Sequence, residues 1–223
     1  SAEVQLVLAT LNVQTLGKGG GLFPDPLAPE FLVAPARAQM LAQQLMEERV
    51  MLVGIQEARS RKRAAGKLPH FLTYASGATA KGTHGCEIWI NYDLPYATCD
   101  GKELFFAQDH VQVLHADVRR LLVTLRAPYC VLDLLVMHAP SNDSPHSALR
   151  AWWDETYRVL AERRRPARLI ILADASSHVG SVTSPAVGCH QAELENNNGA
   201  FWHELLLYHS LALPATMAAY QHG

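Results

Sequence analysis

Four polar side chains with the potential for chemistry stand at or just after the ends of apolar segments: Asn12, Glu57, His138 and Asp174. Together they offer one amide, two carboxylates and one imidazole, an oxygen-rich set that suits a hard divalent cation such as Mg²⁺. Such a cation polarises a phosphoryl oxygen, and an acidic residue beside it can take a proton from an attacking water. The four residues therefore predict metal-assisted attack on a phosphate if the fold brings them together. Each also has an ordinary structural role, since Asn and Asp often only form turns.

The segment before Asp174 shows why these positions are of interest. Residues 169–172 are large aliphatics, and a short unbroken apolar run is typical of a strand buried on both faces. Only small and polar residues, with the single exception of Val179, follow Asp174 as far as Gly180. The carboxylate is therefore expected at the rim of a sheet, where ligands and metals commonly bind in αβ proteins.

A cluster of cations follows Glu57 within residues 59–67. It consists of Arg59, Arg61, Lys62, Arg63 and Lys67. Such a cluster suits a phosphate backbone that runs past the carboxylate. A solvated charged loop explains the same residues equally well.

The elements that must position these residues are strands and helices separated by polar loops. Strands are expected over residues 4–11, 50–55, 84–91, 111–115, 119–125, 131–137, 169–172 and 212–217. Helices are expected over residues 35–48, 145–165 and 201–207, and a surface loop over 17–29. In the helix over 145–165, Trp152, Trp153 and Tyr157 are expected to be core anchors. Neighbouring strands joined by short loops favour a sandwich over a single parallel sheet.

Composition limits the class of protein. The chain has 223 residues, of which 49% are hydrophobic and 18% charged, so it can bury a substantial core. A net charge of -2 argues against a surface that is basic all over, and any contact with nucleic acid must come from local clusters. No apolar run is long enough to span a membrane, and no signal peptide opens the sequence, so neither a membrane nor secretion is expected.

The four cysteines form no metal motif. Cys86, Cys99, Cys130 and Cys189 make no C-x-x-C pair, and Cys130 lies in an apolar run that favours a reduced core thiol. This usage indicates a reducing, intracellular setting. A zinc hydrolase built on Asp174, His178 and His190 is disfavoured because no spacing of zinc ligands is present. A serine hydrolase is disfavoured because no G-x-S-x-G motif occurs.

Five segments, in order along the chain, resemble the motifs of the endonuclease/exonuclease/phosphatase superfamily, which includes the DNase-I-like nucleases and the apurinic endonucleases. The segments are Leu11-Asn12-Val13-Gln14-Thr15-Leu16, Gly54-Ile55-Gln56-Glu57, Gly85-Cys86-Glu87-Ile88-Trp89-Ile90, His138-Ala139-Pro140-Ser141 and Leu172-Ala173-Asp174-Ala175-Ser176. A later part of the chain is similar to the endonuclease domain of non-LTR retrotransposons. It comprises Glu195-Asn196-Asn197-Asn198-Gly199, the helix that follows, and Leu213-Pro214-Ala215-Thr216.

The resemblance implies an α+β fold, a four-layer αββα sandwich in one domain over residues 1–223, with a Mg²⁺ site at one edge and Mn²⁺ as an alternative. It implies that Asn12 orients the site, that Glu57 ligates the metal, and that Asp174 positions or deprotonates the water. Asn12 and Asp174 join Glu57 in the implied metal set. His138 stands where many members place a Tyr next to the phosphate.

The resemblance also implies contacts with the substrate. The basic cluster supplies Arg59 and Arg61, and the tail supplies Asn198. Arg119 or Arg120 matches a basic strand position that faces the site in some members. These residues favour DNA as the substrate and a phosphodiesterase that nicks it, as a monomer, in the nucleus if it derives from a retrotransposon. A reverse transcriptase domain in the same parent polypeptide is then the expected partner.

The sequence departs from the family pattern in two places. Family members usually carry Gly-Asp-x-Asn where this chain has Ala173-Asp174-Ala175-Ser176, so Ser176 replaces an amide that helps to hold the phosphate. Loss of such a donor typically costs roughly a factor of 10² to 10³ in rate, part of which a hydroxyl can restore. The final Ser-Asp-His motif and the Trp strand before it do not occur at the end of the 223 residues. A sandwich incomplete at its C-terminus, lacking its last strands, with an exposed sheet edge and impaired activity is therefore expected.

Two other functions remain open at this point. Another member of the superfamily would hydrolyse RNA or a small phosphoester, as a deadenylase, an inositol-phosphate phosphatase or a sphingomyelinase does. A catalytically dead sandwich would only bind nucleic acid or a protein partner, and the departures at Ser176 and at the terminal motif favour it. The target sequence cut by an active enzyme does not follow from these residues.

Overall fold

A computed structural model describes residues 2–14, 35–163 and 166–217 of the chain. The chain forms two compact units: the first contains Ser1–His138 and Glu162–Ala173, and the second contains Ala139–Ala161 and Asp174–Gly223. The single domain expected from the sequence stays a prediction. The surface loop expected over residues 17–29 lies outside the described residues.

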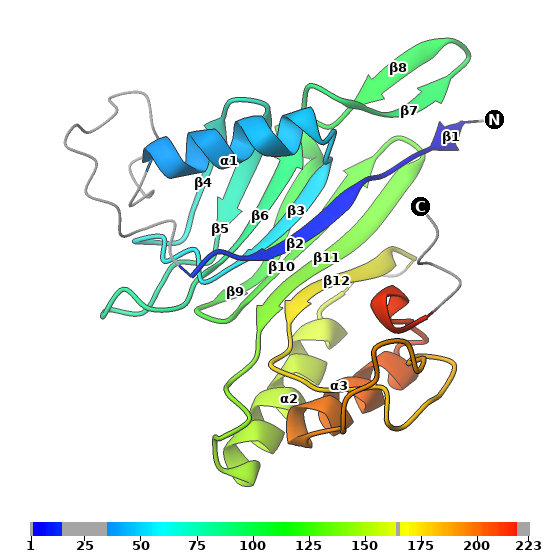
Figure 1. Ribbon diagram of the computed structural model, residues 1–223. Coiled ribbons are helices and arrows are strands. Elements are labelled where there is room, and N and C mark those ends of the chain that lie inside the picture. The colour runs from blue at the N-terminus through cyan, green and yellow to red at the C-terminus, as the bar shows by residue number, and fades with distance from the viewer. Residues whose placement is uncertain (1, 15–34, 164–165, 218–223) are drawn as a thin grey trace. The chain divides into compact units, whose positions relative to one another are not determined.

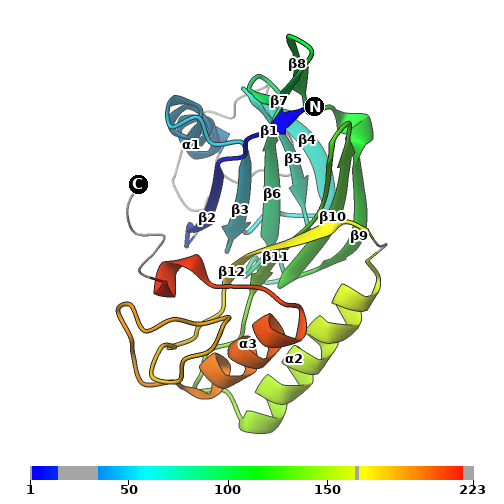
Figure 2. The same cartoon turned by 90° about the vertical axis from the view of Figure 1, so that its right-hand side faces the viewer.

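Two sheets build the first unit (Figures 1 and 2). The five-stranded sheet has the order β2-β3-β6-β5-β4, with β2 and β3 parallel and the other pairs antiparallel. Its strands are β2 (Leu8–Asn12), β3 (Leu52–Gln56), β4 (Ala64–Leu68), β5 (Phe71–Ala75) and β6 (Cys86–Asn91). The four-stranded sheet has the order β12-β11-β10-β9. Its strands are β9 (Val111–Asp117), which follows the short 3₁₀ turn Gln108–His110, then β10 (Arg120–Ala127), β11 (Cys130–His138) and β12 (Arg168–Asp174).

A smaller third sheet joins the N-terminus to a hairpin. It has the order β1-β7-β8, from β1 (Glu3–Val4), β7 (Pro95–Cys99) and β8 (Lys102–Phe105). After β1 the chain changes its pairing partner from the β7 strand to the start of β3. The Gln5 N–H donates to Tyr96 O, whereas Val7 O accepts from the Met51 N–H. This crossing explains why the strand expected over residues 4–11 is two strands with a break.

Apolar side chains fill the space between the two large sheets. Leu52 and Ile88 of one sheet and Leu121, Leu134 and Val136 of the other are among the buried residues of a single cluster. The helix α1 (Pro35–Glu47) covers the opposite face of the five-stranded sheet, as Figure 1 shows. Its buried side chains are Ala38, Ala42 and Leu45, which pack with Val53, Ile55, Phe71 and Trp89. The α+β sandwich expected from the sequence is therefore confirmed.

Two helices organise the second unit, α2 (His146–Ala161) and α3 (Asn197–Tyr208). Trp153 of α2 lies 6.4 Å from Phe201 and 6.0 Å from Trp202 of α3, measured between ring centroids. Asn196 caps α3, because its side-chain oxygen accepts from the Gly199 N–H at 2.7 Å. None of the helices in the described residues is both long and apolar enough to cross a membrane.

The end of the second unit differs from the expectation. Residues 212–217 do not form a strand: Pro214–Thr216 is a single 3₁₀ turn. Pro214 opens this turn and has no N–H to give to a sheet, so the strand prediction is wrong there.

Candidate functional site

The parallel pairing of β2 and β3 brings the first two predicted residues together. Asn12 is opposite Gln56 in the register, which places it beside Glu57, the next residue of the chain. The Asn12 Nδ2 donates to Glu57 Oε1 at 3.4 Å, while Asn12 Oδ1 accepts from the Gln14 N–H at 3.1 Å. The amide is thus held from both sides next to the carboxylate.

Gln56, the last residue of β3, fixes this end of the sheet through two side-chain hydrogen bonds. It is buried, and its Nε2 donates to Leu172 O and to Thr10 Oγ1, both at 3.0 Å. A buried amide bonded to two strands fixes the end of β3, because breaking either bond would leave a polar group unpaired. The residue that follows it, Glu57, therefore leaves the sheet at a defined point.

The backbone around Glu57 is left-handed at four non-glycine residues. The φ angles are 44° at Gln14, 55° at Glu57, 57° at Arg59 and 64° at His84. Non-glycine residues adopt this conformation at an energetic cost, and such residues gather at functional sites. Left-handed residues also occur elsewhere among the described residues, so these four show that the backbone turns tightly at this edge of the sheet.

His138, at the end of β11, faces the same carboxylate. Its Nε2 lies 3.7 Å from Glu57 Oε1, and its ring centroid lies 5.8 Å from that of His84. Arg119 joins the two histidines: its Nη1 donates to His138 O at 3.1 Å, and its Nη2 lies 3.2 Å from His84 Nε2. Of the predicted catalytic residues, the structure thus brings Asn12, Glu57 and His138 together within the first unit.

Positive charge surrounds Glu57. Arg59 Nη2 lies 3.4 Å from Glu57 Oε2, and the two side chains are 27% and 21% exposed, so solvent or a ligand can reach them. Burial, followed by the charges of Arg119 and His138, lowers the pKa of His84. The site therefore combines one carboxylate with two guanidinium groups and a neutral imidazole, which suits an anionic phosphate.

The hydrogen bonds of Asp117 distinguish the two neighbouring arginines, Arg119 and Arg120. Its Oδ1 accepts from the N–H groups of Arg119 and Arg120, and its Oδ2 accepts from Arg120 Nε at 2.9 Å. Burial raises the pKa of Asp117, but bonds from His115 and Arg119 outweigh it and hold the pKa below its usual value. Arg120 is buried and bonded to Asp117, so it has a structural role, and Arg119 is the candidate for substrate contact.

The remaining predicted contacts of the first unit lie on the basic cluster. Arg61 is exposed, and its predicted contact with substrate stays a prediction. Lys67, in β4, lies over the Tyr92 ring at 4.0 Å from the centroid, which is a contact with the protein's own surface.

Asp174 and Ser176 form a local turn in the second unit. Asp174 Oδ1 accepts from the Ser176 N–H at 3.0 Å, and Ser176 has a φ of 47°. The backbone of Asp174 is fixed as well, since its carbonyl accepts from the Ala139 N–H at 2.8 Å. These two residues belong to the other unit, so their approach to Glu57 stays a prediction.

Asn198 has a structural role, and its predicted contact with substrate is wrong. The side chain is fully buried, donates to Pro140 O at 2.8 Å and accepts from Trp153 Nε1 at 2.9 Å. Its backbone N–H donates to Asn142 Oδ1. Every polar group of the residue is used inside the second unit, so none remains for a ligand.

Comparisons with known proteins give the fold. No protein-family model matches the chain, and no curated protein matches its sequence. Among solved structures, an AP endonuclease from Archaeoglobus fulgidus superposes with a TM-score of 0.52 at 15% identity, over 92% of this chain and 71% of that one. The chain has the fold of the DNase-I-like superfamily.

Two other solved structures are similar to this chain at lower scores. The endonuclease domain of TRAS1, a telomere-specific non-LTR retrotransposon, matches with a TM-score of 0.48 at 17% identity, over 81% of this chain. The Xenopus laevis APE2 catalytic domain matches with a TM-score of 0.47 at 14% identity, over 89% of this chain and 67% of that one. The chain spans 66% of the length of the TRAS1 domain.

Glu57 and Asn12 are the described residues from which the predicted magnesium site would be built. In residues 2–14, 35–163 and 166–217 no group of three or more His, Cys, Asp or Glu side chains is arranged to hold a metal. The Glu57 carboxylate lies beside the Asn12 amide, whose Nδ2 faces Glu57 and whose Oδ1 accepts from the Gln14 N–H. Mg²⁺ commonly takes only one or two protein oxygens and keeps several waters, so the Glu57 carboxylate is the oxygen donor that this site offers, and the metal stays a prediction.

His84 is the site residue that the sequence analysis missed. The alternating pattern assigned it to the strand over 84–91, but β6 begins at Cys86, after Gly85 turns the chain with a φ of 94°. A His-Gly pair before a strand is the signal that could have indicated a turn there, since Gly supplies the left-handed conformation at little cost.

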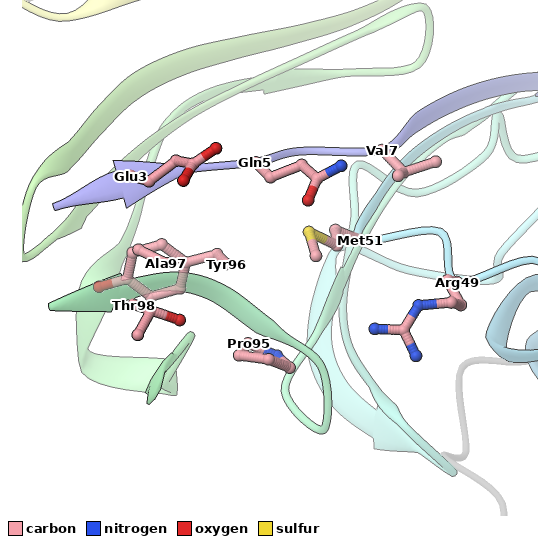
Figure 3. A pocket seen from close by; sticks show the side chains of 9 residues that line it. All are labelled: Glu3, Gln5, Val7, Arg49, Met51, Pro95, Tyr96, Ala97 and Thr98. Carbon is pink, nitrogen blue, oxygen red and sulfur yellow. The ribbon is translucent and has the colours of Figure 1, made fainter. Parts of the chain in front are cut away.

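A separate cavity of about 270 Å³ lies at the other ends of β2 and β3 (Figure 3). Val7 and Met51, which line it, precede these strands, whereas Asn12 and Glu57 come at or after their ends. Figure 3 shows Glu3 and Arg49 toward its two sides. The cavity is therefore distinct from the candidate site.

Proposed function

We propose that this chain hydrolyses phosphodiester bonds in DNA as a metal-dependent endonuclease. The observation that carries the proposal is the setting of Glu57, whose carboxylate meets the Asn12 amide and the Arg59 guanidinium and faces His138. A carboxylate and an amide oxygen suit a hard cation, and the surrounding cationic groups suit a phosphate. The DNase-I-like fold is consistent with this activity.

Glu57 and Asn12 would hold Mg²⁺, or Mn²⁺ as an alternative, with Asp174 as the third ligand predicted from the sequence. Mg²⁺ in this position would polarise a phosphoryl oxygen and stabilise the leaving oxygen. These residues are the only metal ligands the proposal requires of the protein.

The cationic residues bind and orient the phosphate. Arg119 is fixed by His84 and by the carbonyl of His138, so its guanidinium is held in one orientation for an oxygen of the substrate. Arg59 shields the charge of Glu57, and the exposed Arg61 extends the positive surface along the strand of DNA. Asp174 takes the proton from the attacking water, and Ser176 donates to the phosphate.

The proposal also includes the kind of endonuclease from which the chain derives. A retrotransposon endonuclease that works in the nucleus, next to a reverse transcriptase, is supported by the sequence motifs at Glu195-Asn196-Asn197-Asn198-Gly199 and Leu213-Pro214-Ala215-Thr216. The role of Asn198 in this tail is to hold the second unit together, which is compatible with a motif that marks a family without touching its substrate.

A panel of substrates tests the proposal. Supercoiled plasmid, a single-stranded RNA oligonucleotide and p-nitrophenyl phosphate are each incubated with the protein and Mg²⁺, with and without EDTA. We expect nicked plasmid only when Mg²⁺ is free. Cleavage of RNA alone would show that the substrate is RNA and not DNA, and release of p-nitrophenol alone would show that it is a small phosphoester. Binding of plasmid without cleavage of any substrate would make the chain a binding protein.

A further inference from the structure

The C-terminal ends of α2 and α3 present aromatic rings on the surface of the second unit. Tyr208 is 74% exposed and Leu207 is 49% exposed. The ring centroid of Tyr208 lies 5.3 Å from that of Tyr157 and 5.0 Å from that of His209, with interplanar angles of 89° and 83°. Exposed large side chains gathered in this way mark binding surfaces more often than scattered ones do.

Two carboxylates flank these rings. Asp154 is one turn before Tyr157 on α2, and Glu204 is one turn before Tyr208 on α3, so each acid lies on the same helix face as its aromatic neighbour. Burial, followed by the charge of Glu204, raises the pKa of Tyr157 to about 12, and Asp154 contributes to the same shift. In the part of the chain that the structure describes, neither carboxylate has an ion-pair partner.

The C-terminal end of α3 adds further negative potential. The last turn of α3 contains no basic residue, so the partial negative charge of its C-terminal carbonyls is not offset there. On α2 the nearby cation Arg158 is already paired with Glu155 at 2.7 Å. The faces of aromatic rings are also negative, and they attract ammonium and guanidinium groups. All of these features favour a cationic ligand.

We propose that this surface, the α2–α3 patch formed by Asp154, Tyr157, Glu204, Leu207, Tyr208 and His209, binds a basic segment of a partner polypeptide. Arg or Lys side chains of the partner stack on Tyr208 and pair with Glu204 and Asp154. The Tyr157 hydroxyl beneath this surface is buried and has no hydrogen-bond partner among the described residues. Nucleic acid is disfavoured at this surface because both carboxylates repel phosphate.

Fluorescence anisotropy tests the proposal with a fluorescein-labelled nona-arginine peptide and a labelled 20-mer of thymidine, at low and moderate salt. The variants Tyr208→Ala and Glu204→Gln are compared with the wild-type chain. The matched controls are Tyr129→Ala and Glu103→Gln, which change an exposed Tyr and an exposed Glu of the first unit. Melting temperatures establish that all variants are folded.

We expect the peptide to bind the wild type, with affinity weakened roughly three- to fivefold by Tyr208→Ala and by a similar factor by Glu204→Gln, while the controls bind like the wild type. Equal weakening by the controls, or no effect of either patch variant, would overturn the proposal. Binding of the thymidine 20-mer that depends on Tyr208 would assign the patch to nucleic acid instead. Sedimentation of the wild type as a dimer that Tyr208→Ala dissociates would assign it to a second copy.

Discussion

Arg119 Nη2 lies 3.2 Å from His84 Nε2. A guanidinium can only donate, so the imidazole nitrogen must accept, and the proton of His84 is therefore on Nδ1. The lowered pKa of His84, which arises from burial and then from Arg119 and His138, favours the same neutral form. The imidazole thus acts as a fixed acceptor that orients the arginine of the candidate site.

This relationship predicts how stability depends on pH. The folded state holds His84 neutral below its ordinary pKa of 6.5, whereas the unfolded chain binds a proton there. The wild type therefore keeps this contribution above about pH 6.5 and loses it as the pH falls. His84→Asn has no such group, and Asn tolerates the left-handed φ of 64°. Melting temperatures from about pH 8 to about pH 5 should fall more steeply for the wild type than for the variant. Parallel curves would contradict the prediction.

Glu87 gives the opposite dependence on pH. Its carboxyl group is fully buried in β6 and is hydrogen-bonded by the Ser60 hydroxyl and by Trp89 Nε1, the latter at 2.6 Å. Burial raises its pKa, so the folded state retains a proton that the unfolded chain releases above its ordinary pKa of 4.5, and stability falls as the pH rises. Glu87→Gln keeps both partners without ionising.

We therefore expect Glu87→Gln to be more stable than the wild type at about pH 8 and to approach it near pH 4. Glu87→Ala leaves a cavity and an unbonded Trp89 Nε1, and should lose about 3 kcal/mol. Urea unfolding at several pH values measures both. A Gln variant that is less stable than the wild type at every pH would show that the carboxylate is ionised in the fold.

Gly54 lies at a close approach of the two large sheets. A Cβ at this position would lie 2.5 Å from Leu172 Cβ and 2.8 Å from Val136 Cγ2, and neither neighbour is the flexible end of a long side chain. Gly54→Ala should therefore cost about 1–3 kcal/mol of unfolding free energy, because the sheets must separate to admit the methyl group. Chemical denaturation measures it, and an unchanged midpoint would mean that the sheets are less tightly apposed.

Ser176 is the departure from the family pattern with the clearest consequence. Its φ of 47° is a conformation that Asn tolerates better than Ser, and its N–H would still donate to Asp174 Oδ1. Ser176→Asn should therefore fold at least as well as the wild type. If the resemblance assigns this position correctly, the added amide raises the rate of plasmid nicking by roughly tenfold or more. A slower or unchanged rate would remove Ser176 from the site.

The sequence predicted the positions of several site residues because a polar residue after an apolar run indicates where a strand ends. Asn12, Glu57 and His138 follow apolar runs, and the parallel pairing of β2 with β3 does bring the first two together. The same reasoning placed Asp174 at the end of β12, as observed. Periodicity reports which face of a strand is buried, and a polar residue that interrupts it is visible without the structure.

Other site features depend on contacts between distant residues, which periodicity does not encode. The sequence does not distinguish Arg119 from Arg120. In the structure Asp117 binds the side chain of Arg120, which is buried, and leaves Arg119 for the candidate site. The resemblance of the Asn-rich tail implied that Asn198 contacts the substrate, but Trp153, 45 residues away, binds its side chain. The sequence pattern assigned His84 to a strand, whereas the turn at Gly85 places it outside that strand.

The nicking rate of Glu57→Gln decides whether this chain cleaves DNA at the proposed centre, because that centre is built around the Glu57 carboxylate. The control is Glu48→Gln, which changes an exposed glutamate just after α1. Both proteins are first shown to melt like the wild type, and nicked plasmid is then followed over time with Mg²⁺. We expect a rate for Glu57→Gln that is at least about 100-fold lower than that of the wild type and of Glu48→Gln. A Glu57→Gln variant that nicks plasmid as fast as the wild type would contradict it.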